Sequence, residues 1–171
     1  MRPVALRDFR VPTHRLAGML WGEVNATYRC NRRGASYYSC SGHGGYVVDS
    51  RALTARERRK IDKYKLPLPL NLLVQHRNGG GDVVVGVDAA MFANRYRPRR
   101  MFHYSPGLGP VEWQELPVYV FEEDCDWAIL EHLTEVHDND RRGRIISEHR
   151  RKSVARDTFR RWARPVGERQ Q

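Results

Sequence analysis

Two stretches of alternating apolar and polar residues, separated by a short turn sequence, constrain the fold of this chain most. The stretches are "WGEVNATYRC" (21–30) and "ASYYSCSGHGGYVVD" (35–49), and "NRRG" stands between them. Aromatic and β-branched residues that alternate with polar ones are typical of half-buried strands, and Asn with Gly favours a turn. The sequence therefore predicts an antiparallel hairpin, with His43 near the end of the second strand or at a bulge.

The remaining segments predict an α+β fold. Thr54 and Glu57 of "TARE" can cap each other reciprocally, so we expect a helix there that reaches about Tyr64 and is stopped by "LPLPL". "VVVGVD", "MFHY" and "PVYVF" predict further strands, the last two joined by the loop "SPGLGPVEWQEL". Helical spacing from Asp126 to Val136 predicts another helix. We expect a curved, mainly antiparallel sheet with two or three helices and a basic C-terminal helical tail.

The length bounds the number of domains. A chain of 171 residues is long enough for one domain with a core and short for two. We expect a single α+β domain over residues 1–140 and the basic tail over 141–171. Ile145, Ala155, Phe159 and Trp162 form the best apolar stripe of the tail, but basic residues surround it. We therefore expect an exposed or partner-bound helix there.

The net charge of +10 is distributed unevenly along the chain. Residues 101–140 contain no Lys or Arg but hold half of the 20 acidic residues, whereas basic residues dominate 141–164, "ARERRKIDKYK" and "NRYRPRR". Two interpretations stay open. The blocks neutralise each other in the fold, or they leave a basic face for an anionic partner and an acidic pocket for another ligand.

The basic segments predict a surface for nucleic acid or a nucleoprotein. Lys and Arg neutralise backbone phosphates without reading sequence, and Tyr37, Tyr38, Tyr96, Phe159 and Trp162 lie where they can stack on bases. The sequence has no helix-turn-helix, RNP or zinc-finger pattern, which argues against sequence-specific regulation. The residues expected at the interface are Arg95, Arg97, Arg99, Arg100, Arg141, Arg142, Arg144, Arg150, Arg151, Lys152, Arg156, Arg160 and Arg161.

Three short motifs follow one another in the first part of the chain: "LWGEV", "SGHGGYVVDSR" and "FEEDCDWAIL". In them the chain resembles an uncharacterised domain family of phage, plasmid and integrative-element proteins, which has a Trp-Gly pair, a His-Gly-Gly turn and a Glu-Glu-Asp-Cys segment. The matching positions are Trp21 with Gly22, 43–45, and 122–125, within a resemblance that spans about 20–136. It implies a mobile-element origin and a shared site geometry, and no reaction.

The motif residues admit a chemical and a structural interpretation. A histidine between glycines is open to close approach, and beside Glu122, Glu123 or Asp124 His43 becomes an oriented base or anion clamp. Cys125 becomes a nucleophile if a histidine and a helix N-terminus lower its pKa. Alternatively, the glycine turn only connects two strands, and Cys125 is a core residue. The candidate catalytic residues are His43, Glu122, Glu123, Asp124 and Cys125.

Metal, cofactor and membrane sites are not expected. Cys30, Cys40 and His43, or His132, His137, Asp138 and Asp140, lack the spacing of known metal modules. Three cysteines without a CxxC pair predict reduced thiols. No apolar segment is long enough to span a bilayer, and the first 15 residues lack a secretory signal pattern, so we expect a cytoplasmic protein.

Three functions remain open from the sequence. The preferred one is a non-enzymatic phage or mobile-element accessory protein that binds nucleic acid or a nucleoprotein through a basic surface. The second is an enzyme that uses a histidine–acid pair on a phosphate-bearing substrate. The third is a protein-interaction module that modulates a host or defence factor through an acidic surface of that partner.

Overall fold

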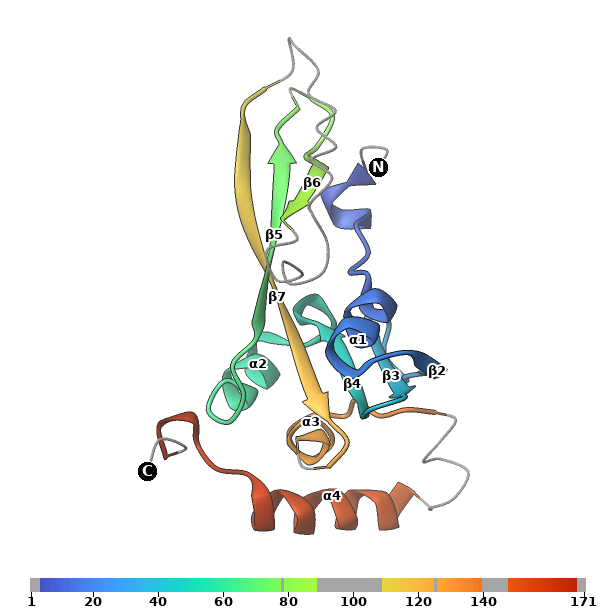
Figure 1. The fold of residues 1–171 in the computed structure, drawn as a ribbon. Coiled ribbons are helices and arrows are strands. Elements are labelled where there is room, and N and C mark those ends of the chain that lie inside the picture. The colour runs from blue at the N-terminus through green and yellow to red at the C-terminus, as the bar shows by residue number, and fades with distance from the viewer. Residues whose placement is uncertain (1–3, 78, 89–108, 125, 140–147, 169–171) are drawn as a thin grey trace. The chain divides into compact units, whose positions relative to one another are not determined.

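The computed structural model describes residues 4–77, 79–88, 109–124, 126–139 and 148–168 (Figure 1). It confirms the α+β class: β1 pairs with β6, β2 with β3, β3 with β4, β4 with β7 and β5 with β6, each time antiparallel. The strands are β1 (Val4–Ala5), β2 (Val24–Arg29), β3 (Ala35–Cys40), β4 (Gly44–Asp49), β5 (Leu68–Gln75), β6 (Val83–Asp88) and β7 (Val111–Glu122). The α-helices are α1 (Thr13–Trp21), α2 (Ala55–Ile61), α3 (Trp127–Leu133) and α4 (Glu148–Trp162).

The chain divides into two compact units that share strand β7. Unit 1 comprises Met1–Val11 and Leu68–Pro117, and unit 2 comprises Pro12–Pro67 and Val118–Gln171. Neighbouring strands follow the order β1-β6-β5-β7-β4-β3-β2, so the first part of β7 belongs to unit 1 and the rest to unit 2. The boundary expected near residue 140 lies outside the described residues.

The predicted hairpin is present in unit 2 as β2 and β3, with Tyr28 opposite Tyr37. The second stretch does not form one strand, however. It turns back after Cys40 and continues as β4, with the Cys40 N–H donating to the His43 carbonyl across 2.9 Å. His43 therefore lies in the connection between β3 and β4. The expected single strand, with His43 near its end or at a bulge, was wrong.

Both faces of the central strands in unit 2 are covered. Strand β4 is buried along its whole length, as expected for a strand packed on both sides. Helix α1 covers one face, where Thr13 and Tyr38 share a hydrogen bond of 2.6 Å. On the other face Tyr46 and Phe121 pack with α2 and α3, and α3 lies between these strands and α4 (Figure 1).

Helix α2 begins as predicted and ends earlier. Thr54 and Glu57 form the reciprocal cap, and the helix stops at Ile61 instead of Tyr64. Helix α4 forms within the predicted tail, and Ala155 on it is fully buried in the core of unit 2. The tail helix thus packs on the core through Ala155, while the other residues of α4 whose burial is described are exposed or half-buried. No helix in the described part of the chain combines the length and apolar character needed to cross a membrane.

Unit 1 contains strands that sequence patterns did not predict well. "LPLPL" was expected only to stop a helix, yet β5 begins within it at Leu68. The expected loop 105–116 was wrong in its last part, because β7 already begins at Val111. Strand β6 coincides with "VVVGVD". The strand expected at "MFHY" lies outside the described residues.

Candidate nucleic-acid interface

His43 and Asp124 lie near each other on the surface of unit 2. The Nδ1 atom of His43 is 3.6 Å from Oδ2 of Asp124, and their side chains are 60% and 71% exposed. That distance exceeds a hydrogen bond, and solvent screens the interaction between exposed charges. The turn therefore holds a loose surface pair, without the burial that would fix the orientation of the imidazole.

Glu123 has a structural role in the same place. Its N–H donates to the carbonyl of Gly44 across 2.8 Å, and its Oε2 accepts from the hydroxyl of Tyr37 at 2.9 Å. Glu122 is exposed and stands opposite Gly45 in the strand pairing. Three of the candidate acids are thus near the His-Gly-Gly turn, but only Asp124 meets the His43 ring. Cys125 lies outside the described residues.

Two glycines of the turn are required by close approach of the backbone. A Cβ on Gly44 would lie 2.5 Å from the Tyr38 carbonyl oxygen and 3.0 Å from Oε2 of Glu123. A Cβ on Gly45 would lie 2.0 Å from the Phe121 carbonyl oxygen, and its φ is +152°. The close approach of the Tyr38 and Phe121 carbonyl oxygens is therefore sufficient reason for glycine at positions 44 and 45.

The cysteines that the structure describes are protected thiols. Cys30 and Cys40 are free and lie at opposite ends of the β2–β3 hairpin, too far apart in register to share a ligand. Burial, reinforced by Asp138 and Glu131, raises the pKa of Cys30, and burial and Glu123 raise that of Cys40. Across the described ranges no three His, Cys, Asp or Glu side chains are grouped to hold a metal ion.

Much of the acidic block is used inside its own unit. Asp126 forms an ion pair with Lys65, and Glu135 pairs with Lys152 across 3.2 Å. The Tyr46 hydroxyl donates to buried Glu131 and also lies 3.1 Å from Oδ2 of buried Asp138. For Asp126 and Glu135, these contacts agree with the interpretation in which the acidic and basic blocks neutralise each other.

The described cations of α4 follow one side of the helix. Lys152, Arg156 and Arg160 are four residues apart and exposed, so they lie above one another along the axis. Arg161 is exposed beside them. Of the other predicted interface residues, Arg150 and Arg151 lie in α4 without described side chains. Those outside the described residues are Arg95, Arg97, Arg99, Arg100, Arg141, Arg142 and Arg144.

His132 on α3 lies within the electrostatic influence of cations from two other helices. Partial burial lowers the pKa of His132, and the positive charges of Arg160, Arg156 and Lys60 lower it further. Lys60 comes from α2, and the two arginines come from α4. The positive charges of the three cations therefore act together at His132. We call this group of four residues the basic cluster.

Aromatic packing holds the basic cluster together. The Phe159 ring of α4 lies 4.6 Å from the ring of His132 and 4.9 Å from that of Tyr64, centroid to centroid. Tyr64 follows α2 directly, so Phe159 connects α2, α3 and α4. A hollow of about 360 Å³ is lined by residues of α4 and by residues of α3 and the segment after it, among them His132, Lys152 and Arg156 and also the acids Glu131 and Glu135.

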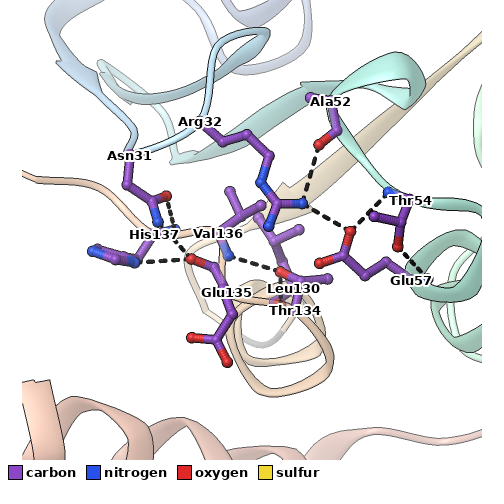
Figure 2. A network of polar contacts seen from close by, with 10 residues as sticks. All are labelled: Asn31, Arg32, Ala52, Thr54, Glu57, Leu130, Thr134, Glu135, Val136 and His137. Carbon is purple, nitrogen blue, oxygen red and sulfur yellow. Dashed lines mark hydrogen bonds and ion pairs between the residues drawn. The ribbon is translucent and has the colours of Figure 1, made fainter.

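A polar network orients α2 and the end of α3 within unit 2 (Figure 2). Arg32 of the hairpin turn donates to Oε2 of Glu57 at 2.8 Å and to the Ala52 carbonyl at 3.1 Å. Burial opposes ionisation of Glu57, but hydrogen bonds from Arg32 and Thr54 outweigh it and lower the pKa of Glu57. Asn31 accepts from the His137 N–H and donates to the Glu135 carbonyl. The turn "NRRG" thus contacts the start of α2 and the segment just after α3, the two helices that carry Lys60 and His132.

Sequence reasoning missed two members of the basic cluster. Lys60 lies in "ARERRKIDKYK", which was recognised as basic, but its electrostatic effect on His132 of α3 is a long-range relationship. His132 carried no local signal apart from its residue type. Among the aromatic residues expected to stack on bases, Tyr37 and Tyr38 are buried and Phe159 is packed, while Trp162 is 59% exposed. Tyr96 lies outside the described residues.

Comparisons with protein-family models, with curated proteins and with solved structures give no match.

Proposed function

We propose that this protein is a non-enzymatic accessory protein of a phage or other mobile element that binds nucleic acid, alone or in a nucleoprotein, through the basic cluster. The observation that carries the proposal is the row of exposed cations on α4, Lys152, Arg156 and Arg160, whose positive charge adds to that of Lys60 at His132. Like charges brought together in this way repel each other, and an anionic partner relieves that repulsion. The mobile-element origin rests on the resemblance of the three motifs.

The charge environment supports an anion as the partner. Within the described part of the chain, no carboxylate lies in ion-pair distance of Lys60 or Arg160. The acids of the neighbouring block are partly used by Lys65 and Lys152. A phosphate backbone supplies negative charges in a row, which fits the row of cations along α4. We assign the activity to the cytoplasm, where free thiols such as Cys30 and Cys40 persist.

The test is a salt titration of binding, followed by fluorescence anisotropy of a labelled mixed-sequence oligonucleotide. The logarithm of the affinity should fall linearly with the logarithm of the salt concentration, by about 0.9 per phosphate contacted on duplex DNA. Arg160→Gln should reduce this slope by about one phosphate contact. Arg7→Gln removes an equal charge from an 88% exposed side chain of unit 1 and should leave the slope unchanged.

Point variants are preferable to removal of the tail. Ala155 and Phe159 belong to or pack against the core of unit 2, so a chain without α4 would lose apolar packing as well as charge. Absence of binding to any oligonucleotide at low salt would overturn the proposal. An acidic surface on a host or defence protein would then become the better candidate for the partner.

The second candidate function is an enzyme acting on a phosphate-bearing substrate. The observation in its favour is the 3.6 Å approach of His43 to Asp124 beside the glycine turn. A phosphatase or nuclease assay with wild type and His43→Ala tests it, because a general base contributes about 100-fold or more to rate. Equal turnover by the two proteins, or none by either, would exclude this candidate.

A further inference from the structure

We propose that the basic cluster and Trp162 together hold single-stranded nucleic acid, with the Trp162 ring stacked on an unpaired base. This inference rests on the proposed function and narrows its substrate class. Trp162 is the last residue of α4, and its side chain is 59% exposed. The guanidinium carbon of Arg161 lies 6.0 Å from the centroid of its ring.

The position of Trp162 follows from the apolar stripe of α4. Ala155 is fully buried, Phe159 is half-buried against His132 and Tyr64, and Trp162 stands one turn further along and is exposed. Spacings of four and three residues keep all three on one side of the helix. The stripe therefore leads from the core, past the basic cluster, to an aromatic ring in solvent.

The charge around Trp162 distinguishes it from an ordinary exposed side chain. Single exposed apolar residues are common and need no partner. Trp113 of unit 1 is 56% exposed, but Glu112 and Glu115 flank it in β7. Trp162 instead follows Arg160 and Arg161, and Arg164 comes two residues later. An anionic strand is therefore attracted to the surroundings of Trp162 and repelled from those of Trp113.

Stacking on Trp162 requires a base whose face is accessible. In a duplex the base faces are covered by their neighbours, and a protein meets phosphates and base edges. In a single strand an unpaired base can stack on an aromatic ring while cations track the backbone. Lys152, Arg156 and Arg160 rise by about 6 Å at each step along α4, which suits a backbone running toward the C-terminal end of the helix. Trp162 faces another side of the last turn, so the strand bends around that end to place a base on its ring.

The test compares Trp162→Ala with Trp113→Ala on two labelled probes, an oligothymidylate of about 20 nucleotides and a mixed-sequence duplex. Loss of one base stack should weaken binding of Trp162→Ala to the oligothymidylate by about 5- to 100-fold. Its duplex affinity and the salt slope on both probes should stay as in wild type, because Trp162 neutralises no phosphate. Trp113→Ala should match wild type on both probes.

Intrinsic fluorescence gives a second readout of stacking. Trp21 and Trp127 are buried, so quenching of wild type by oligothymidylate should come from Trp162 and persist in Trp113→Ala. Wild-type binding to both probes with no selective loss in Trp162→Ala would overturn the single-strand inference and leave the proposed function in place. Wild-type binding to neither probe would overturn the proposed function, and the inference with it.

Discussion

The carbonyl oxygen of Phe121 occupies the place where a side chain on Gly45 would begin. A Cβ at Gly45 would lie 2.0 Å from that oxygen, and the φ of Gly45 is +152°. Gly45→Ala should therefore lower the free energy of unfolding by more than about 2 kcal/mol, through strain and through displacement of β7 from β4. Urea denaturation followed by circular dichroism measures this. Gly167→Ala, at a site with no atom within 4 Å, is the control and should be neutral.

The pair formed by His43 and Asp124 is expected to contribute little to stability. Exposed ion pairs are worth at most about 1 kcal/mol, so His43→Ala should keep the melting temperature close to that of wild type. Oligonucleotide binding should also persist, because the basic cluster lies on other elements. Thermal melts and anisotropy check both expectations. A folded His43→Ala protein that no longer binds would move the interface to the glycine turn.

His76 gives unit 1 a dependence on pH. Its Nδ1 lies 2.9 Å from Asp82 and its Nε2 lies 2.9 Å from Glu112. Hydrogen bonds to Asp82 and then to Glu112 raise the pKa of His76, so its contribution is complete below its ordinary pKa of 6.5 and is lost as pH rises through the raised value. Hydrogen bonds from Gln114 and then His76 lower the pKa of Glu112, so that contribution is lost as pH falls below 4.5.

The contribution of His76 and its two carboxylates to the stability of unit 1 should therefore be highest between about pH 4.5 and 6.5. Hydrogen exchange of the His76 amide, which donates to the Pro110 carbonyl, should accelerate above that range beyond the intrinsic effect of pH. His76→Gln should remove this excess. If the pH dependence of this hydrogen exchange were the same in His76→Gln as in wild type, Asp82 and Glu112 would not hold a charged imidazolium.

Phe159→Ala should destabilise unit 2. The ring contacts both His132 and Tyr64, and it is half-buried, so the expected loss is about 1–3 kcal/mol, below that of a fully buried phenylalanine. Val154→Ala, on an exposed position of the same helix, should change the free energy of unfolding by less than about 1 kcal/mol. Equal melting temperatures for the two variants would show that α4 is an independent tail.

Local signals predicted the elements whose causes are local. The reciprocal cap of Thr54 and Glu57, the valine run of β6 and the turn at Asn31 depend on residues a few positions apart, and the structure contains all three. Helix α1 was not predicted, and its Thr13 depends on a partner 25 residues away. Strand β5 was missed because Pro67 and Pro69 favour a breaker when neighbouring strands are unknown.

The candidate site was predictable only in part. The chemical interpretation of the motifs required His43 to lie beside an acid of 122–124, and antiparallel pairing of β4 with β7 brings Asp124 within 3.6 Å of it. The sequence does not tell the two glycines of the turn apart: Gly45 has the positive φ, whereas Gly44 is required by the approach of the Tyr38 carbonyl. The basic cluster joins residues of three helices, and no sequence period reports such a long-range contact.

Protonation of His132 should couple pH to nucleic-acid binding. Its pKa is lowered in the free protein by partial burial and by Arg160, Arg156 and Lys60, so the ring is neutral at pH 7. A bound phosphate backbone adds negative charge there and raises that pKa, and by linkage the affinity must increase as pH falls below about 6.5. The free protein meanwhile loses stability over the same range, because a histidine with a lowered pKa resists protonation in the folded state.

Circular dichroism at each pH verifies that the protein remains folded. Anisotropy titrations at constant salt should show several-fold tighter binding at the lower pH, lost in His132→Gln and kept in His14→Gln on α1. A pH dependence that survives in His132→Gln would place the responsible group outside the basic cluster.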